Sequence, residues 1–115
     1  RTYLGRCPRT HWEAIVMSWK AGNRTSIHAH PQFAGYYFAD GEFQVEIFEQ
    51  AGPTALKLAN VVRVNGQEGF AAIGHPGRFD NHIHRITCLS ATAHSLHVYS
   101  DDALRGMTFV RNDSE

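Results

Sequence analysis

The feature that most constrains the fold of this 115-residue chain is a series of short β-type segments separated by turn residues. Residues 42–49, EFQVEIFE, alternate polar and apolar side chains, as expected for a strand that is buried on one face. No apolar pattern with the helical period extends beyond two turns. Further apolar, β-branched or aromatic runs lie at 12–19, 33–39, 82–89, 94–100 and 106–111. About eight short strands with regular turns predict an all-β barrel or sandwich.

Two dipeptides between these runs are typical of tight turns. Asp40-Gly41 separates residues 33–39 from 42–49, and Asn65-Gly66 divides the long β-type stretch 56–73. Both dipeptides favour two-residue β-hairpins, because asparagine, aspartate and glycine tolerate the positive φ angles of such turns. The sequence therefore predicts a hairpin at each of these two positions.

Composition limits the classes of partner. The hydrophobic fraction is 43%, the charged fraction is 19% and the formal net charge is zero, which indicates one globular domain over residues 1–115. A neutral chain lacks the basic surface needed to bind nucleic acid or an anionic membrane. No apolar run approaches the ~20 residues that span a bilayer. An exposed barrel edge would be compatible with a homodimer.

The two cysteines, Cys7 and Cys88, are far apart in the sequence. This spacing indicates neither a disulfide framework nor a cysteine-based zinc site. We therefore expect two reduced thiols in a cytoplasmic protein, with Cys88 acting as a small buried apolar side chain.

Histidine is the unusual residue, with eight copies in so short a chain. Side chains at positions i and i+2 of a strand project from the same face, so His28 and His30 should direct their imidazoles to one point. The same reasoning applies to His82 and His84. It also groups the polar side chains of residues 95, 97 and 99 on one face of the strand 94–100.

The residue types around His30 limit the metal chemistry. The first acidic residue after His30 is Asp40, so no carboxylate is available for a two-histidine, one-carboxylate set. Three neutral imidazoles remain as the expected ligands: His28, His30 and one of His82 or His84. Such a set leaves the charge of a divalent metal uncompensated. It therefore favours an anionic ligand such as a thiolate, and dioxygen if the metal is Fe(II).

Three segments together resemble the cysteine dioxygenase group of thiol dioxygenases in the cupin superfamily. They are SWKAGNRTSIHAHP (18–31), IHRIT (83–87) and SLHVYS (95–100), and the resemblance covers roughly residues 3–100. It implies a single cupin domain over residues 1–115, which is a double-stranded β-helix or jelly-roll barrel.

The resemblance also implies roles for individual residues. His28, His30 and His84 match the ligands of an Fe(II) cofactor, with His84 preferred over His82 because it directly precedes an arginine. Ser95, His97 and Tyr99 match an outer-sphere relay whose tyrosine hydroxyl faces the substrate. The arginine that binds the substrate carboxylate in this group matches Arg6, with Arg9 as a competitor.

The activity implied by the resemblance is oxidation of a small thiol by O2 to a sulfinic acid, with cysteine or 3-mercaptopropionate as examples of the substrate. Some members carry a cysteine crosslinked to the tyrosine, where this chain has Gly35, so we expect no crosslink. Two other functions stay open: a non-catalytic cupin that binds metal or ligand for sensing or storage, and a metal-dependent isomerase or hydrolase. The aromatic stretch 36–38 is expected to form barrel core, and His11, His75 and His94 are expected at the surface or in loops.

Overall fold

The computed structural model describes residues 1–53, 55–75, 77–78 and 81–109. Within these ranges the chain forms ten strands and one 3-10 helix, which confirms the all-β prediction. The elements are β1 (Thr2–Arg6), β2 (Glu13–Lys20), β3 (Ile27–His30), β4 (Phe33–Asp40), β5 (Glu42–Gln50), β6 (Leu56–Asn65), β7 (Glu68–Ile73), β8 (Asn81–Cys88), β9 (Thr92–Tyr99), η1 (Ala103–Arg105) and β10 (Thr108–Phe109). In the same ranges, no helix has the length and apolar character needed to cross a membrane.

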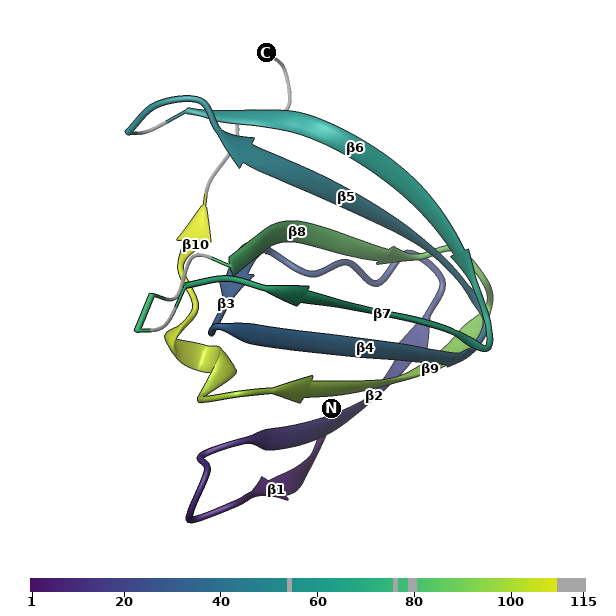
Figure 1. The fold of residues 1–115 in the computed structure, drawn as a ribbon. Helices are drawn as coiled ribbons and strands as arrows, with labels where there is room; N and C mark the ends of the chain where they lie inside the picture. The colour runs from purple at the N-terminus through teal and green to yellow at the C-terminus, as the bar shows by residue number, and fades with distance from the viewer. Residues whose placement is uncertain (54, 76, 79–80, 110–115) are drawn as a thin grey trace.

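The strands form two five-stranded antiparallel sheets. One sheet has the order β1-β2-β9-β4-β7 and the other has the order β10-β3-β8-β5-β6. Figure 1 shows β4, β7 and β9 in one wall of the barrel and β5, β6 and β8 in the other. The functional side chains described below come from both walls and meet in the space between them.

Both turn predictions hold as turns, but the hairpin predictions are wrong. Strand β4 pairs with β7 and β9, whereas β5 pairs with β6 and β8, so Asp40-Gly41 carries the chain from one sheet to the other. The turn at Asn65-Gly66 does the same between β6 and β7. Phe38 and Phe43, on either side of the first turn, face each other across the barrel with ring centroids 4.5 Å apart. Consecutive strands that bury their apolar faces against each other pack face to face rather than edge to edge.

Gly41 is required at its turn for two reasons. Its φ is +90°, a region that other residues rarely adopt, and an added Cβ would overlap the Cβ of Ala93. The sharp crossover between the two walls therefore depends on glycine.

Strand boundaries from the sequence agree closely with those observed for β2, β4, β5, β8 and β9. The expected last strand, 106–111, is only Thr108–Phe109 in the described residues, and positions 110–111 lie outside them. Strand β1 was not predicted. It lies at the end of its sheet, and its side chains are mostly exposed, so it lacks the alternation of a half-buried strand.

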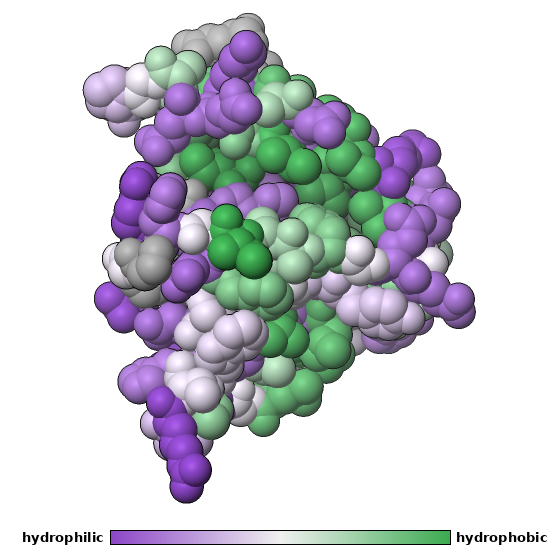
Figure 2. Space-filling model, viewed as in Figure 1, coloured by the Kyte–Doolittle hydropathy of each residue, from purple (hydrophilic) through white to green (hydrophobic). Residues whose placement is uncertain are grey.

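The outer strands β6 and β7 do not pair with each other, and the barrel is open between them. A cavity of about 180 Å³ lies there, lined mainly by apolar side chains: Val45, Ile47, Val62, Val64 and Phe70. Figure 2 shows hydrophobic side chains gathered in the upper centre of this face, between hydrophilic rims.

The core between the walls is aromatic and aliphatic, and Phe43 is completely buried in it. Replacing Phe43 with alanine is expected to lower the free energy of unfolding by about 3–5 kcal/mol, because a large cavity replaces a packed ring. Urea denaturation checks this value. The exposed Tyr37 offers a control, since Tyr37→Ala should cost about 1 kcal/mol or less. Equal losses for the two variants would contradict this assignment of the core.

Candidate metal centre

Three histidines from two paired strands of one wall form a compact cluster. His28 and His30 lie on β3, and His84 lies opposite His28 on β8. The three ring centroids are 4.6–4.7 Å apart, and one ligand atom from each residue lies within 4.8 Å of the others. A β-bulge follows His28, since His30 is paired with Asn81 rather than with His82. The bulge changes the direction of the β8 side chains beside the cluster.

Backbone carbonyls set the orientation of two of these rings. His28 Nδ1 lies 2.8 Å from the carbonyl oxygen of Ser26, and His84 Nδ1 lies 2.8 Å from that of His82. Each Nδ1–H therefore donates to a carbonyl, which leaves Nε2 as the lone-pair atom that faces the cluster. His30 Nε2 and His84 Nε2 are 3.4 Å apart. Two nitrogens bound at about 2.1 Å to one metal with near-tetrahedral geometry are separated by about this distance.

The cluster is neutral, as metal-binding imidazoles must be. Burial lowers the pKa of His30 to about 2, and it lowers the pKa of His84 well below its ordinary value. Neighbouring histidines lower both values further. Among the described residues no carboxylate joins the cluster. The buried residue of β4 that is paired with Tyr99 is Ala34, whose side chain has no donor atom either.

His82 occupies a different place from His84. Its ring stacks on that of His84 at 4.5 Å, and its carbonyl accepts the hydrogen bond from His84 Nδ1. Its backbone has a φ of +54°, which is unusual for a residue other than glycine. Within the described part of the chain, His82 Nε2 is buried without a hydrogen-bond partner. The structure thus brings His84 into the three-histidine cluster and leaves His82 behind it.

Three side chains, supported by a fourth, form a hydrogen-bonded relay beside the cluster. Ser95, His97 and Tyr99 share the buried face of β9, as the alternation in the sequence predicts. Ser95 Oγ lies 2.6 Å from His97 Nε2, and Tyr99 Oη lies 3.2 Å from His97 Nδ1. The indole N–H of Trp19 donates to Ser95 Oγ at 2.8 Å. Trp19 belongs to the segment 18–31 that resembles thiol dioxygenases, but that resemblance did not predict this contact.

Tyr99 connects the relay to the cluster. Its ring stacks on the His30 ring at 4.8 Å, and its ring centroid lies 6.2 Å from that of Tyr36. The hydroxyl of Tyr36 lies 2.6 Å from His30 Nε2 and 3.2 Å from His84 Nε2. The sequence reading assigned Tyr36 to the barrel core. Tyr36 is buried in the core, as predicted, but its contacts with the two histidines were not predicted.

A cavity of about 240 Å³ opens onto these groups, enough for a small organic molecule. His28, His30, His84, His97, Tyr99 and Tyr36 all line it, together with Arg1. Burial, His28 and then the charge of Arg1 lower the pKa of His97. Burial raises the pKa of Tyr99, and the charge of Arg1 opposes this rise. Arg1 is therefore a cation beside the cavity, at a position that the sequence patterns did not predict.

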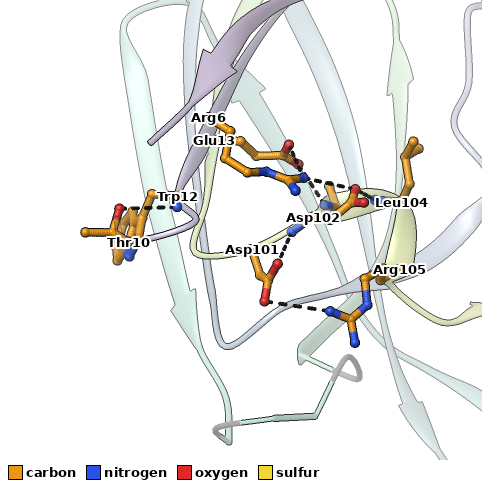
Figure 3. Close-up of polar contacts among 9 residues, drawn as sticks. Arg6, Thr10, Trp12, Glu13, Asp101, Asp102, Leu104 and Arg105 are labelled. Atoms are coloured by element: carbon orange, nitrogen blue, oxygen red, sulfur yellow. Dashed lines mark hydrogen bonds and ion pairs between the residues drawn. The ribbon is translucent and has the colours of Figure 1, made fainter. Parts of the chain in front are cut away.

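The structure places Arg6 elsewhere. Its guanidinium donates to the buried carboxylate of Glu13 at 3.0 Å and lies 3.6 Å from Asp102 (Figure 3). Neither Arg6 nor the exposed Arg9 is among the described residues that line the cavity.

Gly35 does not face Tyr99 directly. A Cβ added at Gly35 would lie 3.0 Å and 3.2 Å from two atoms of the Phe33 ring. The residue of β4 that is paired with Tyr99 is Ala34. Neither Gly35 nor Ala34 carries a sulfur atom, so neither position offers a partner for a crosslink to Tyr99.

Acidification of the metal-free protein is expected to weaken the fold through the buried His97. Burial, followed by the charges of His28 and Arg1, lowers the pKa of His97 to about 4. Below the unfolded-state pKa of about 6.5, the unfolded chain binds a proton that the folded chain takes up only near pH 4. The free energy of unfolding therefore falls as the pH drops through this window, by about 2 kcal/mol at pH 5 for this group.

Urea denaturation at pH 7 and pH 5 in a chelator measures this effect. His97→Gln should lose about 2 kcal/mol less than the parent protein between the two pH values. If His97→Gln and the parent protein lose the same free energy of unfolding between pH 7 and pH 5, the pKa of His97 is not lowered by folding.

Comparisons with known proteins identify the fold. No protein-family model matches the chain, and no curated protein matches it. Solved structures do. A cupin superfamily protein from Desulfitobacterium hafniense DCB-2 has a TM-score of 0.63 and 14% identity, over 88% of this chain and 75% of that one. The cupin domain of Schizosaccharomyces pombe Cnp3 has a TM-score of 0.65 and 12% identity, over 88% of this chain and 63% of that one.

A third similar structure is an enzyme. The DMSP lyase DddQ from Ruegeria pomeroyi DSS-3 has a TM-score of 0.55 and 19% identity, over 81% of this chain and 40% of that one. This chain thus spans less than two thirds of the Cnp3 and DddQ chains. At these identities the likeness extends to the fold, and the chain has the all-β cupin fold that the resemblance implies.

Proposed function

We propose that this protein is a non-haem iron thiol dioxygenase that oxidises a small thiol with O2 to a sulfinic acid. The observation that carries the proposal is the combination of three neutral histidines and the Ser95–His97–Tyr99 relay around one small cavity. The reaction balances as RSH plus O2 giving RSO2H. The fold is compatible with an enzyme, since one similar structure is a lyase.

The ligand set fits Fe(II). The ligands would be the neutral imidazoles of His28, His30 and His84, whose Nε2 atoms converge. Imidazole is a suitable ligand for iron. When bound, Fe(II) would supply sites for the thiolate sulfur and for dioxygen and would lower the pKa of the thiol. Without a carboxylate among its ligands, such a centre favours an anionic substrate atom.

The relay would orient one phenol toward the cavity. Trp19 Nε1 can only donate, so Ser95 accepts there, and its own hydroxyl proton is available to His97 Nε2. A neutral His97 then carries its proton on Nδ1 and donates to the Tyr99 hydroxyl oxygen. Burial raises the pKa of Tyr99, which keeps the phenol protonated near neutral pH. Tyr99 would therefore present an oriented O–H group to the reacting atoms.

Arg1 supports a substrate that carries a carboxylate. Arg1→Gln is expected to raise KM for a mercapto-carboxylate by about 10- to 100-fold, the loss of one charged hydrogen bond. The KM for cysteamine, which lacks a carboxylate, should change little. Steady-state oxygen consumption measures both values. Arg9→Gln is the matched control, because Arg9 does not line the described cavity, and an equal rise in KM for both variants or both thiols would argue against this role.

The proposal is tested by loading the protein anaerobically with Fe(II) and adding cysteine, 3-mercaptopropionate or cysteamine with O2. Consumption of O2 with matching formation of sulfinate would support the dioxygenase. Tight metal binding with no oxygen uptake for any thiol would favour a sensor or storage cupin. Turnover of another small molecule without O2, with zinc or manganese, would favour an isomerase or hydrolase.

A further inference from the structure

The hydroxyl of Tyr36 has an unusual set of neighbours. Tyr36 is buried on β4, in the wall opposite to the three histidines, and its side chain crosses the barrel to reach them. Its oxygen contacts His30 Nε2 and His84 Nε2, the two atoms whose lone pairs would bind a metal. We propose that the Tyr36 oxygen is a fourth protein ligand of the metal held by His28, His30 and His84.

The distances carry this inference. The Tyr36 oxygen lies 2.6 Å from His30 Nε2 and 3.2 Å from His84 Nε2, and the two nitrogens are 3.4 Å apart. A triangle with these sides has a point about 2.0–2.1 Å from all three corners, which is the usual distance from a metal to nitrogen or oxygen. The three atoms therefore already have the spacing of neighbouring ligands around one ion.

The chemistry of the contacts also points to a ligand. A metal at this point would take up the lone pairs of both nitrogens, and the Tyr36 hydroxyl would lose both of them as acceptors. Its oxygen would then lie beside a cation in a buried site, where no carboxylate among the described residues supplies an anionic donor. Binding of the phenol oxygen to that cation would give the buried oxygen a partner and the cation a fourth donor. Phe38, on the same face of β4, packs in the core without any polar atom, so packing does not require the hydroxyl of Tyr36.

The inference rests on the metal centre of the proposed function but not on the thiol chemistry. A histidine-only centre would have three nitrogen donors. The centre inferred here has three nitrogens and one phenol oxygen, which is a donor set suited to ferric iron as well as to Fe(II).

The test uses the colour of the ferric protein. The full chain is loaded with Fe(II) without air and then oxidised with ferricyanide, and its visible spectrum is recorded. A phenol oxygen bound to Fe(III) gives an intense charge-transfer band, which three histidines do not give. We expect the band in the parent protein and in Tyr99→Phe, and we expect its loss in Tyr36→Phe. Tyr99 is a matched control because its phenol lines the same cavity and its ring stacks on that of His30.

A second measurement is the affinity for Zn(II) by competition with a chelator. Because Tyr36 is a ligand in this inference, Tyr36→Phe should bind Zn(II) more than roughly 100-fold more weakly than the parent protein. Tyr99→Phe should bind within about threefold. Circular dichroism verifies that each variant is folded. If Tyr36→Phe does not fold, the parent spectrum still decides, because a ferric parent protein without the band overturns the inference.

The outcomes separate this inference from the proposed function. A parent protein that binds neither iron nor zinc overturns the metal centre itself. A parent protein that binds metal with no visible band, and with equal Zn(II) affinity in Tyr36→Phe, overturns the role of Tyr36 alone. A band that disappears in Tyr99→Phe and persists in Tyr36→Phe would assign the ligand to Tyr99 instead.

Discussion

Replacing His84 with alanine is expected to abolish stoichiometric binding of Fe(II) and, with it, oxidation of any thiol. His84 is fully buried, and its Nε2 lies 3.4 Å from His30 Nε2, so His84→Ala removes one of the three nitrogen atoms that could hold the metal. Removing a group that hydrogen-bonds to a metal ligand already lowers metal affinity by about 10- to 100-fold. Removing the ligand itself should lower the affinity by more than roughly 100-fold. Iron content after desalting and chelator competition measure the effect.

His94 provides the control for this experiment. It is exposed and pairs with Asp40 at the surface, away from the three histidines, so His94→Ala should bind iron like the parent protein. If His84→Ala proves unstable, His28→Ala removes a half-buried ligand at lower risk to the fold. Full iron occupancy and full activity in either ligand variant would refute the three-histidine centre.

Replacing Tyr99 with phenylalanine is expected to lower turnover by about 10²- to 10⁴-fold while iron stays bound. The phenyl ring of the variant can still stack on His30, and only the hydroxyl that the relay orients is lost. The effect should fall on kcat more than on KM, because the hydroxyl would act on the reacting atoms rather than on the distal part of the substrate. Single-turnover and steady-state oxygen consumption separate the two.

Tyr37→Phe is the matched control for Tyr99→Phe. Tyr37 is the neighbouring residue of Tyr36 in the chain, but its side chain is exposed, so removal of its hydroxyl should leave turnover unchanged. A Tyr99→Phe protein with parental kcat would mean that the relay has no part in the reaction. A protein that loses its iron would mean that Tyr99 is structural or a ligand.

Much of the fold follows from local sequence patterns. The alternation in β5 and the aromatic and β-branched runs of β2, β4, β8 and β9 identify strands to within two residues, because each strand buries one face or both. The error at Asp40-Gly41 has a physical cause. A turn dipeptide specifies the path of a few residues, whereas the choice between a hairpin and a crossover depends on which strand edges are already paired.

The same distinction applies to the site. Groups on one strand, such as His28 with His30 and Ser95 with His97, could be predicted because alternation along a strand is a local rule. Contacts across the barrel could not be predicted in this way. Tyr36 reaches its histidines, and Trp19 reaches Ser95, only through the register and separation of distant strands. Arg6 shows the reverse case, since the buried carboxylate of Glu13 binds the arginine that the family resemblance favoured.

The two walls of the barrel contribute different groups to the cavity, and this separation has an evolutionary consequence. The three histidines lie on β3 and β8, whereas the relay lies on β9, supported by Trp19 from β2. In the proposed metal centre, mutations on β9 would leave the three histidines unchanged, so a lineage could change the reaction without first losing metal binding. Tyr36 is the exception, because it reaches from one wall to the ligands of the other. We expect directed evolution at positions 95, 97 and 99 to yield folded, metal-loaded variants far more often than substitution at position 36.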